Sequence, residues 1–387
     1  MNAKHLRIAL LVCRFDPGAG GAERYVVALA RALARTDDVH VFAQEFGPPV
    51  AGLTYHRIAR PWKRPRWLNY LFFAWMSWRA TRTGFDMVHA HENSWHGDVH
   101  TVHVVPVTHS LFANKRGWRW CLRCLKLLSS PRLLCYWGLE RARYRAGHQS
   151  VVAVSPWLEA ALRASFPGLP QPVHQIAPVC DFEPRRVPLA DKQRARRALG
   201  LPLQGQCLLF VGNDMRKKGL PQVLRALGQL PAQVVLVVAG ASKQLASMRA
   251  LCAQLGLDER VFFLGAVQAM EVVYAAADCL IHPTLEDSYA MVVLEAMAFA
   301  LPVVLSGPAY CGISGHLHDG VNALMLADPL DIDAIERTLR RILDDAPLAN
   351  NLADHALQFA GAHDASKFAD QYKAVYLEQL ARRPAGL

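Results

Sequence analysis

The stretch HPTLEDSYAMVVLEAMAFALPVVL, residues 282–305, predicts a turn, then a helix, then a buried β-strand. Asp287 stands just before the expected helix start, and Glu295 lies two turns further along, inside the helix. The free backbone N–H groups and the dipole at a helix start favour a bound phosphate. A carboxylate further along can accept hydrogen bonds from the vicinal hydroxyls of a ribose. Because phosphate and diol together describe a nucleotide, and Asp287 can reach a sugar attached to it, the stretch predicts a nucleotide-sugar site.

Buried strands alternate with helices along the whole chain, and this alternation predicts an α/β fold. A strand over residues 6–13, a helix over 22–34 and a strand over 39–43 form a βαβ unit, which implies a parallel sheet. The second half restarts the pattern with strands over 207–211 and 234–239. At 387 residues the chain is long enough for two domains. We expect two Rossmann-like domains that face each other across a cleft.

The domain boundaries are expected where the alternation is interrupted. A proline-bearing irregular segment over 180–189 predicts the linker between the domains. The N-terminal domain is therefore expected over 1–185 and the C-terminal domain over 186–365. The last helix, within 366–387, is amphipathic and is expected to pack back on the N-terminal domain.

The charge is unevenly distributed between the two halves. The net charge is +11; up to Arg185 the chain has 24 Lys and Arg against 12 Asp and Glu, and the remainder has 19 against 20. The asymmetry predicts an anionic partner for the first domain only. Nine cysteines, mostly in apolar contexts, indicate reduced thiols and a cytoplasmic protein. The start of the chain does not read as a signal peptide, and no apolar run is long enough to predict a membrane span.

Two strand-to-helix junctions offer further contacts for an anion. The segment DMRKKG, residues 214–219, places three consecutive cations after a strand, where they could neutralise a diphosphate; a solvated helix start is the alternative. The Gly20-Gly21 turn lets the backbone approach an anionic group closely, and a plain tight turn explains it about equally well.

The chain resembles the retaining glycosyltransferases of the GT-B architecture, from the large group with an E-x7-E motif. The resemblance rests on GGAER (20–24), VVAVSPWLEAAL (151–162), FVGNDMRKKG (210–219) and YAAADCLIHPTLEDSYAMVVLEAMAFALPVV (274–304), in this order. Within the group, GNDMRKKG, the YCG turn at 310–312 and the basic aromatic segment 115–145 are most similar to bacterial lipopolysaccharide core hexosyltransferases.

The resemblance implies roles for individual residues. Asp287 takes the place of the first Glu of the motif and would contact the donor sugar at the catalytic centre, and Glu295 would bind the ribose. The implied donor-binding residues are Gly20, Gly21, Asn213, Lys217, Lys218, Ser288, Ala290, Met291, Val292 and Glu295. The chain departs from the family pattern at Asp287, at Ala290, where the family has Gly, and at Asn213, where it has Arg.

A histidine-rich segment provides the catalytic candidates on the acceptor side. Six histidines crowd it together with Asp98, namely His89, His91, His96, His100, His103 and His109. Such a cluster suggests a metal, but the resemblance implies metal-independent catalysis and no cofactor. The TxH element of the family matches Thr101-Val102-His103. His103 is therefore the first candidate for a residue near the anomeric centre, and Asp98 is the second.

A basic aromatic segment is the candidate for the anionic partner. The predicted membrane-contact residues are Lys115, Arg116, Trp118, Arg119, Trp120, Arg123 and Lys126. Cations interleaved with aromatic anchors suit an interfacial helix on an anionic leaflet. A second aromatic patch over 61–82 fits core helices equally well. Nucleic acid is a third alternative for the charge, but no nucleic-acid motif accompanies it.

These observations predict a cytoplasmic enzyme, peripheral on the inner face of the cytoplasmic membrane. It would transfer a hexose from a nucleoside diphosphate sugar, with UDP the expected nucleotide, to a lipid-linked glycan such as lipopolysaccharide core. Two alternatives remain at this point: a nucleotide-sugar epimerase of similar fold, and a non-catalytic glycan- or lipid-binding protein with a decayed site.

Overall fold

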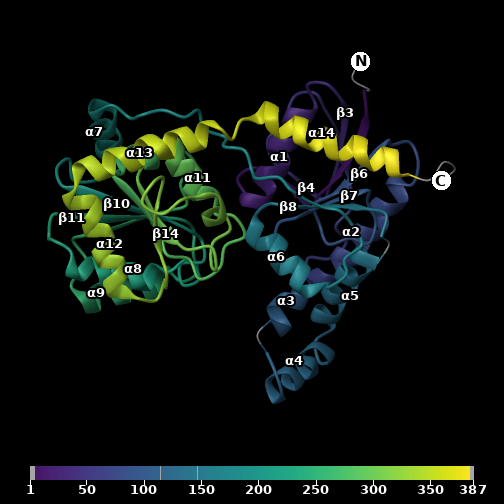
Figure 1. Cartoon of the computed structure of the whole chain (residues 1–387), viewed down its shortest axis with the longest axis horizontal. Coiled ribbons are helices and arrows are strands. Elements are labelled where there is room, and N and C mark those ends of the chain that lie inside the picture. The colour runs from purple at the N-terminus through teal and green to yellow at the C-terminus, as the bar shows by residue number, and fades with distance from the viewer. Residues whose placement is uncertain (1–4, 114, 146, 384–387) are drawn as a thin grey trace. The chain divides into compact units, whose positions relative to one another are not determined.

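The computed structural model describes residues 5–113, 115–145 and 147–383, and the chain divides into two compact units. The first unit comprises the residues up to Val179 together with those from Asp364 onward, and the second comprises Cys180–His363. Each unit has a parallel β-sheet with helices packed around it (Figure 1). The prediction of two α/β domains with parallel sheets is confirmed, and the cleft between them stays a prediction.

The first unit contains a seven-stranded sheet. Its strands, in spatial order, are β5 (Leu53–Arg57), β3 (Asp38–Ala43), β1 (Arg7–Leu11), β6 (Met87–Ala90), β7 (Val99–Val102), β8 (Ser150–Ala153) and β9 (Val173–Gln175). A two-stranded pair adds β2 (Arg14–Phe15) and β4 (Glu45–Phe46). The helices are α1 (Gly21–Leu33), α2 (Arg66–Thr81), α3 (Val107–Phe112), α4 (Trp118–Leu128), α5 (Pro131–Arg145), α6 (Pro156–Ser165) and α14 (Ala365–Arg382).

The second unit contains a six-stranded sheet. Its strands, in spatial order, are β12 (Val261–Gly265), β11 (Val234–Ala239), β10 (Gln206–Val211), β13 (Cys279–His282), β14 (Val303–Ser306) and β15 (Leu324–Leu326). The helices are α7 (Leu189–Ala198), α8 (Leu220–Gln229), α9 (Leu245–Leu255), α10 (Met270–Ala276), α11 (Met291–Ala298), the 3-10 helix η1 (Ile313–His316), α12 (Ile332–Asp344) and α13 (Ala346–Gly361). All six residues of β11, VVLVVA, are buried, as expected for a central parallel strand covered on both faces.

Both sheets reverse their strand order next to the first strand of the unit. In the first sheet β1 lies between β3 and β6, and in the second β10 lies between β11 and β13. Ligands of such sheets bind outside the carboxyl ends of the strands at this switch point. The fold therefore directs attention to the loops after β1 and β6 in one unit, and after β10 and β13 in the other.

The last helix belongs to the first unit. α14 packs against α1, and its Tyr372 hydroxyl lies 2.5 Å from that of Tyr25. The predicted boundaries, after residues 185 and 365, differ from those in the structure, after Val179 and His363. The segment from Cys180 belongs to the second unit because Cys180 N donates to His363 O and Arg185 N donates to Ala298 O.

One helix of the first unit stands apart from its sheet. Figure 1 shows α4 at the end of the α3–α5 region, away from the strands. Nowhere in residues 5–113, 115–145 and 147–383 is a helix both long enough and apolar enough to span a bilayer.

Candidate active site

The predicted cationic junction and the predicted acidic turn meet in the second unit. Lys218 follows β10, Asp287 follows β13, and the Lys218 Nζ lies 2.5 Å from the Asp287 Oδ2. The neighbouring Lys217 Nζ pairs with the Glu286 Oε1 at 2.6 Å, nearer to solvent. Gly219 allows this approach, because a Cβ there would lie 2.1 Å from the carbonyl oxygen of Pro283. The two loops thus form one charged edge at the carboxyl ends of adjacent strands.

Asp287 is held by partners on both carboxylate oxygens. Its Oδ1 accepts the backbone N–H of Ala290 at 3.0 Å, and its Oδ2 lies 3.2 Å from the His282 Nε2. Burial alone would raise the pKa of Asp287. The hydrogen bond with His282 and the charge of Lys218 outweigh burial and hold the pKa well below its usual value. Asp287 is therefore an ionised acceptor of hydrogen bonds. Sequence reasoning missed His282, although its place at the end of β13 is the signal that could have identified it.

The start of α11 supplies backbone donors beside this pair. Ala290, the residue before the helix, has a left-handed backbone with φ 72° and ψ 67°. The side chain of Ala290 makes no capping hydrogen bond, and Met291 and Val292 in the first turn of the helix are half-buried, as is Ser288 in the preceding turn. An uncapped helix start next to Lys218 combines partial positive charge with a full positive charge, which suits a diphosphate.

Glu295 lies deeper than its neighbours in the predicted site. It is 1% exposed, and its Oε2 accepts a hydrogen bond from the Tyr274 hydroxyl at 2.6 Å. Its ribose-binding role stays a prediction. Asn213 has a different local task, because its Oδ1 accepts the backbone N–H of Ala241 at 2.9 Å and braces the loop after β11.

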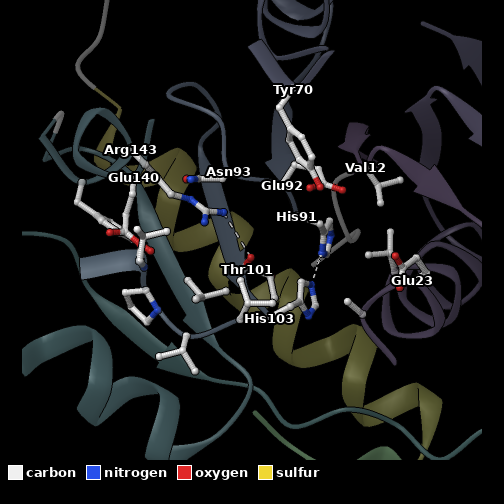
Figure 2. A pocket seen from close by; sticks show the side chains of 18 residues that line it. Val12, Glu23, Tyr70, His91, Glu92, Asn93, Thr101, His103, Glu140 and Arg143 are labelled. Carbon is white, nitrogen blue, oxygen red and sulfur yellow. Dashed lines mark hydrogen bonds between the residues drawn. The ribbon is translucent and has the colours of Figure 1, made fainter. Parts of the chain in front are cut away.

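The first unit contains a cavity of about 230 Å³ at the carboxyl ends of β6 and β7 (Figure 2). Its lining residues are Val12, Ala22, Glu23, Val26, Tyr70, His91, Glu92, Asn93, Thr101, Val102, His103, Val104, Val105, Pro106, Val107, Glu140, Arg143 and Tyr144. Gly20 and Gly21 begin α1, three of whose residues, Ala22, Glu23 and Val26, reach this lining. The predicted catalytic candidate His103 therefore lines this pocket.

Two histidines lie side by side in this cavity. The His91 Nδ1 is 3.0 Å from the His103 Nε2, and Figure 2 shows the two rings facing each other. Burial, with a smaller effect of the Arg143 charge, lowers the pKa of His103 to about 3. Burial also holds the pKa of His91 well below its usual value. Both imidazoles are neutral at ordinary pH and act as hydrogen-bonding groups rather than as charges.

Glu92 and Glu140 are the acidic groups that sequence reasoning missed. Glu92 is the second residue after the end of β6, its Oε1 accepts the Cys13 N–H at 2.9 Å, and burial raises its pKa. The position just after a β-strand is the signal that could have identified it. Glu140 caps α3, because its carboxylate accepts the backbone N–H groups of Val107 and Thr108 at 2.6 and 3.1 Å.

Asp98 is not brought to this pocket, which corrects the sequence-based prediction. It precedes β7, so it lies at the amino edge of the sheet, opposite to the edge where His103 follows β7. There its carboxylate accepts the Val88 N–H at 2.8 Å and pairs with Arg383 at 2.6 Å. Its neighbour His96 lines a separate cavity of about 270 Å³ at the same edge. Across the described part of the chain, no group of three or more His, Cys, Asp or Glu could hold a metal ion.

α4 presents an apolar face to solvent. Trp118, Leu125 and Leu128 are 69%, 63% and 68% exposed, and Cys121 and Leu122 are exposed between them. These positions share one face of a helix. Of the predicted membrane contacts, Arg116, Arg119, Trp120 and Lys126 are exposed, and Lys115 and Arg123 are half-buried. The exposed leucines extend this predicted set of contacts.

Comparison with known proteins identifies both halves of the chain. Residues 191–359 match the family model described as Glycosyl transferases group 1, and residues 19–183 match Glycosyltransferase Family 4. The lipopolysaccharide glucosyltransferase WaaG of Escherichia coli (strain K12) is 31% identical over 173 residues, which are 44% of this chain and 46% of that relative. The match thus spans about half the length of WaaG.

Solved structures extend the likeness to the whole fold. The crystal structure of WaaG superposes with a TM-score of 0.81 at 22% identity and covers 95% of this chain and 99% of that one. Anabaena HepE, solved in complex with UDP and glucose, gives 0.73 at 18% identity, with 97% and 100% covered. The two parallel sheets therefore correspond to the paired domains of the GT-B fold. Each half of the chain thus matches a glycosyltransferase family model, and the fold is of the GT-B type.

Proposed function

We propose that the protein is a retaining hexosyltransferase that takes its sugar from a nucleoside diphosphate donor, with UDP as the nucleotide. The observation that carries the proposal is the pairing of Lys218 with Asp287 beside the uncapped start of α11. It offers a cation and backbone N–H groups for a diphosphate and an ionised carboxylate for sugar hydroxyls. The HepE complexes with UDP and with UDP-glucose support this choice of donor.

The proposed reaction breaks the bond between the anomeric carbon and the diphosphate oxygen, whose electron pair leaves with the diphosphate. The acceptor hydroxyl oxygen bonds to the anomeric carbon on the same face, and its proton passes to a phosphate oxygen of the donor. Lys217, Lys218 and the start of α11 stabilise the charge that develops on the diphosphate. No metal ion or cofactor takes part in this scheme.

His103 contributes a hydrogen bond rather than a proton. Its low pKa, about 3, makes it a weak base at neutral pH. Its partner His91 is buried, and the His91 Nε2 has no hydrogen-bond partner among the described residues. An unpaired lone pair on the His91 Nε2 costs less free energy than an unpaired N–H group, so the ring proton of His91 is on Nδ1 and is donated to the His103 Nε2. The neutral His103 then carries its own proton on Nδ1.

The proposed acceptor is a lipid-linked glycan such as lipopolysaccharide core, presented at the inner face of the cytoplasmic membrane. The outward apolar face of α4 supports this, since Trp118, Leu122 and Leu125 are solvent-exposed on one side of an amphipathic helix. Arg119 and Lys126 flank this face and would contact anionic headgroups. The likeness to WaaG, a lipopolysaccharide glucosyltransferase, points to the same class of acceptor.

The donor assignment is tested by a thermal-shift panel of UDP, GDP and ADP sugars, followed by donor kinetics of Glu295→Gln. If Glu295 binds the ribose, the donor KM rises about 10- to 100-fold, because two hydrogen bonds to a charged acceptor weaken. Tyr274→Phe is the matched control, since it removes the 2.6 Å hydrogen bond to Glu295 and retains the carboxylate. A donor KM equal in the two variants would remove the ribose role, and no thermal shift with any sugar nucleotide would refute the donor.

The membrane assignment is tested by vesicle sedimentation. The double variant Leu122→Gln/Leu125→Gln should bind anionic phosphatidylglycerol vesicles about tenfold or more weakly. Burial of each leucine side chain on insertion contributes roughly 1.5–3 kcal/mol to the free energy of binding. Leu189→Gln, at a leucine 71% exposed on α7, is the matched control and should leave binding unchanged. Equal loss in both variants, or equal binding to neutral phosphatidylcholine vesicles, would contradict an anionic docking surface on α4.

A further inference from the structure

A continuous chain of hydrogen bonds runs beneath the cavity of the first unit. It joins the Tyr376 hydroxyl to His89 Nδ1 (2.7 Å), His89 Nε2 to Thr101 Oγ1 (2.8 Å), and Thr101 Oγ1 to the Tyr372 hydroxyl (2.8 Å). Tyr372 then meets the Tyr25 hydroxyl (2.5 Å), which donates to the carbonyl oxygen of Ile176 (3.2 Å). All five side chains are at most 2% exposed. The chain links α14 to α1 through β6 and β7.

The two ends of this chain fix the direction of every hydrogen bond in it. A carbonyl oxygen only accepts, so the single proton of Tyr25 is directed to Ile176, and Tyr25 must accept from Tyr372. By the same reasoning Tyr372 accepts from Thr101, and Thr101 accepts from His89.

The other end gives the same direction independently. Tyr376 is fully buried, and among the described residues its hydroxyl has one partner, His89 Nδ1. Donation to Nδ1 satisfies that proton, whereas the reverse direction would leave a buried O–H group unpaired. Burial holds the pKa of His89 well below its usual value, so the ring is neutral and carries one proton. That proton must then be on Nε2.

The chain supports the rim of the cavity directly. Thr101 lines the cavity, and His103 follows it by two residues. The ring centroids of His89 and His91 lie 4.1 Å apart, and those of His91 and His103 lie 5.3 Å apart. Figure 2 shows the second of these pairs, His91 and His103. Tyr25 completes the contact, with its ring edge-on to that of His103 at 4.9 Å. A shift of any link would therefore move His103.

We propose that Tyr376, Tyr372 and His89 are positioning residues of the acceptor-side pocket, joined in a one-way chain of hydrogen bonds that fixes His89 with its proton on Nε2 and holds Thr101 and His103 in place. The C-terminal helix α14 is then part of the pocket rather than a cover for the sheet. The effect on catalysis rests on the proposed transferase function, but the tautomer of His89 does not.

The tautomer is measured by nitrogen NMR of the full chain labelled with ¹⁵N histidine. Wild-type His89 should show a protonated Nε2 and an unprotonated Nδ1. Thr101→Val removes the acceptor of the Nε2 proton. Because Nδ1 still accepts from the Tyr376 hydroxyl, the proton should stay on Nε2 and lose its hydrogen bond, which shifts the Nε2–H resonance upfield. A wild-type ring protonated on Nδ1 would overturn the proposal, as would an Nε2–H resonance that Thr101→Val leaves unchanged. The wild-type spectrum decides by itself if Thr101→Val does not fold.

Kinetics then separate positioning from simple stability. Tyr372→Phe and Tyr376→Phe should each lower kcat roughly tenfold or more and leave the donor KM within about twofold, because they remove two and one buried hydrogen bonds of the chain, respectively. Ser150→Ala is the matched control. It removes a buried 2.7 Å hydrogen bond from β8 to Gln379 of the same α14 and should change neither kcat nor the His89 spectrum. An equal loss of kcat in Ser150→Ala and Tyr372→Phe would overturn the positioning role.

Discussion

The two candidate sites of the chain are built on opposite electrostatic principles. In the second unit, Asp287 is kept ionised by Lys218 and His282. In the first unit, burial keeps His91 and His103 neutral at the edge of a cavity. The proposed functions match this contrast, since a diphosphate requires fixed charge, whereas an acceptor hydroxyl requires oriented hydrogen bonds in a pocket that excludes water.

The difference teaches which half of a site is visible in a sequence. Consecutive charged residues at a strand-to-helix junction, such as Lys217 and Lys218, predict an anion-binding site from the sequence alone. The role of a buried neutral side chain depends on its neighbours in the fold, which the sequence does not show. His89, His91 and His100 look alike in the sequence, yet only His91 lines the cavity.

The largest effect should come from acid, which should destabilise the first unit more than the second, because fewer histidines of the second unit have a pKa lowered by burial. Burial lowers the folded-state pKa of His89, His91 and His100, so below about pH 6.5 the unfolded chain binds protons that the folded chain does not. Each histidine then removes up to about 1.4 kcal/mol per pH unit, or about 4 kcal/mol together. Asp287 acts lower: its depressed pKa contributes stability that is lost only below about pH 4.

The measurement can follow the two units separately, because all nine tryptophans lie at or before Trp157, in the first unit. Urea unfolding followed by tryptophan fluorescence should shift to lower urea between pH 7 and pH 5.5. Circular dichroism reports the helices of both units, so its midpoint should move less. Equal shifts by both probes would contradict the contrast between the units.

The next effect concerns the charged site. Lys218→Gln should lower kcat/KM about 100- to 1000-fold, the range for removing one preorganised donor to a developing anion. Lys217→Gln is the matched control, and its loss should stay below about tenfold. The Lys217 side chain is 44% exposed and pairs with a similarly exposed Glu286, so solvent screens it. Losses of equal size would show that the edge acts through net charge rather than through the Lys218–Asp287 geometry.

The fold was predictable because its signals are local. β10 and β11 are nearly unbroken apolar runs, and α1 follows a glycine turn. The hydrophobic pattern and the turn residues were therefore enough to predict parallel sheets. The short strands β5 and β9 escaped prediction. Their half-exposed residues do not form apolar runs, and pairing with the neighbouring strands is what defines them.

The site was predictable only where the chain order decides it. The approach of Lys218 to Asp287 follows from strand order, which a sequence restarting its βα pattern implies. Asp98 failed as a candidate because proximity to histidines in the sequence hides the fact that it precedes its strand while His103 follows it. For α4, the sequence predicted an interfacial helix, but the helical period alone did not show that Leu125 and Leu128 face solvent.

The smallest effect concerns the backbone of the charged site. Among the described residues, the two non-glycine residues with positive φ are Ala290 (72°) and Ala300 (55°), which flank α11 in the second unit. Relief of the left-handed strain is worth about 1–2 kcal/mol, and the added freedom of glycine in the unfolded chain costs about 0.5–1 kcal/mol. Ala290→Gly and its control Ala300→Gly should therefore each stabilise the second unit by about 0.5–1 kcal/mol in urea unfolding followed by circular dichroism. Because Ala290→Gly leaves the backbone N–H groups of α11 in place, donor KM should stay within about twofold. A loss of stability at Ala290 with a gain at Ala300 would mean that the Ala290 methyl, only 4% exposed, packs well enough to outweigh the strain.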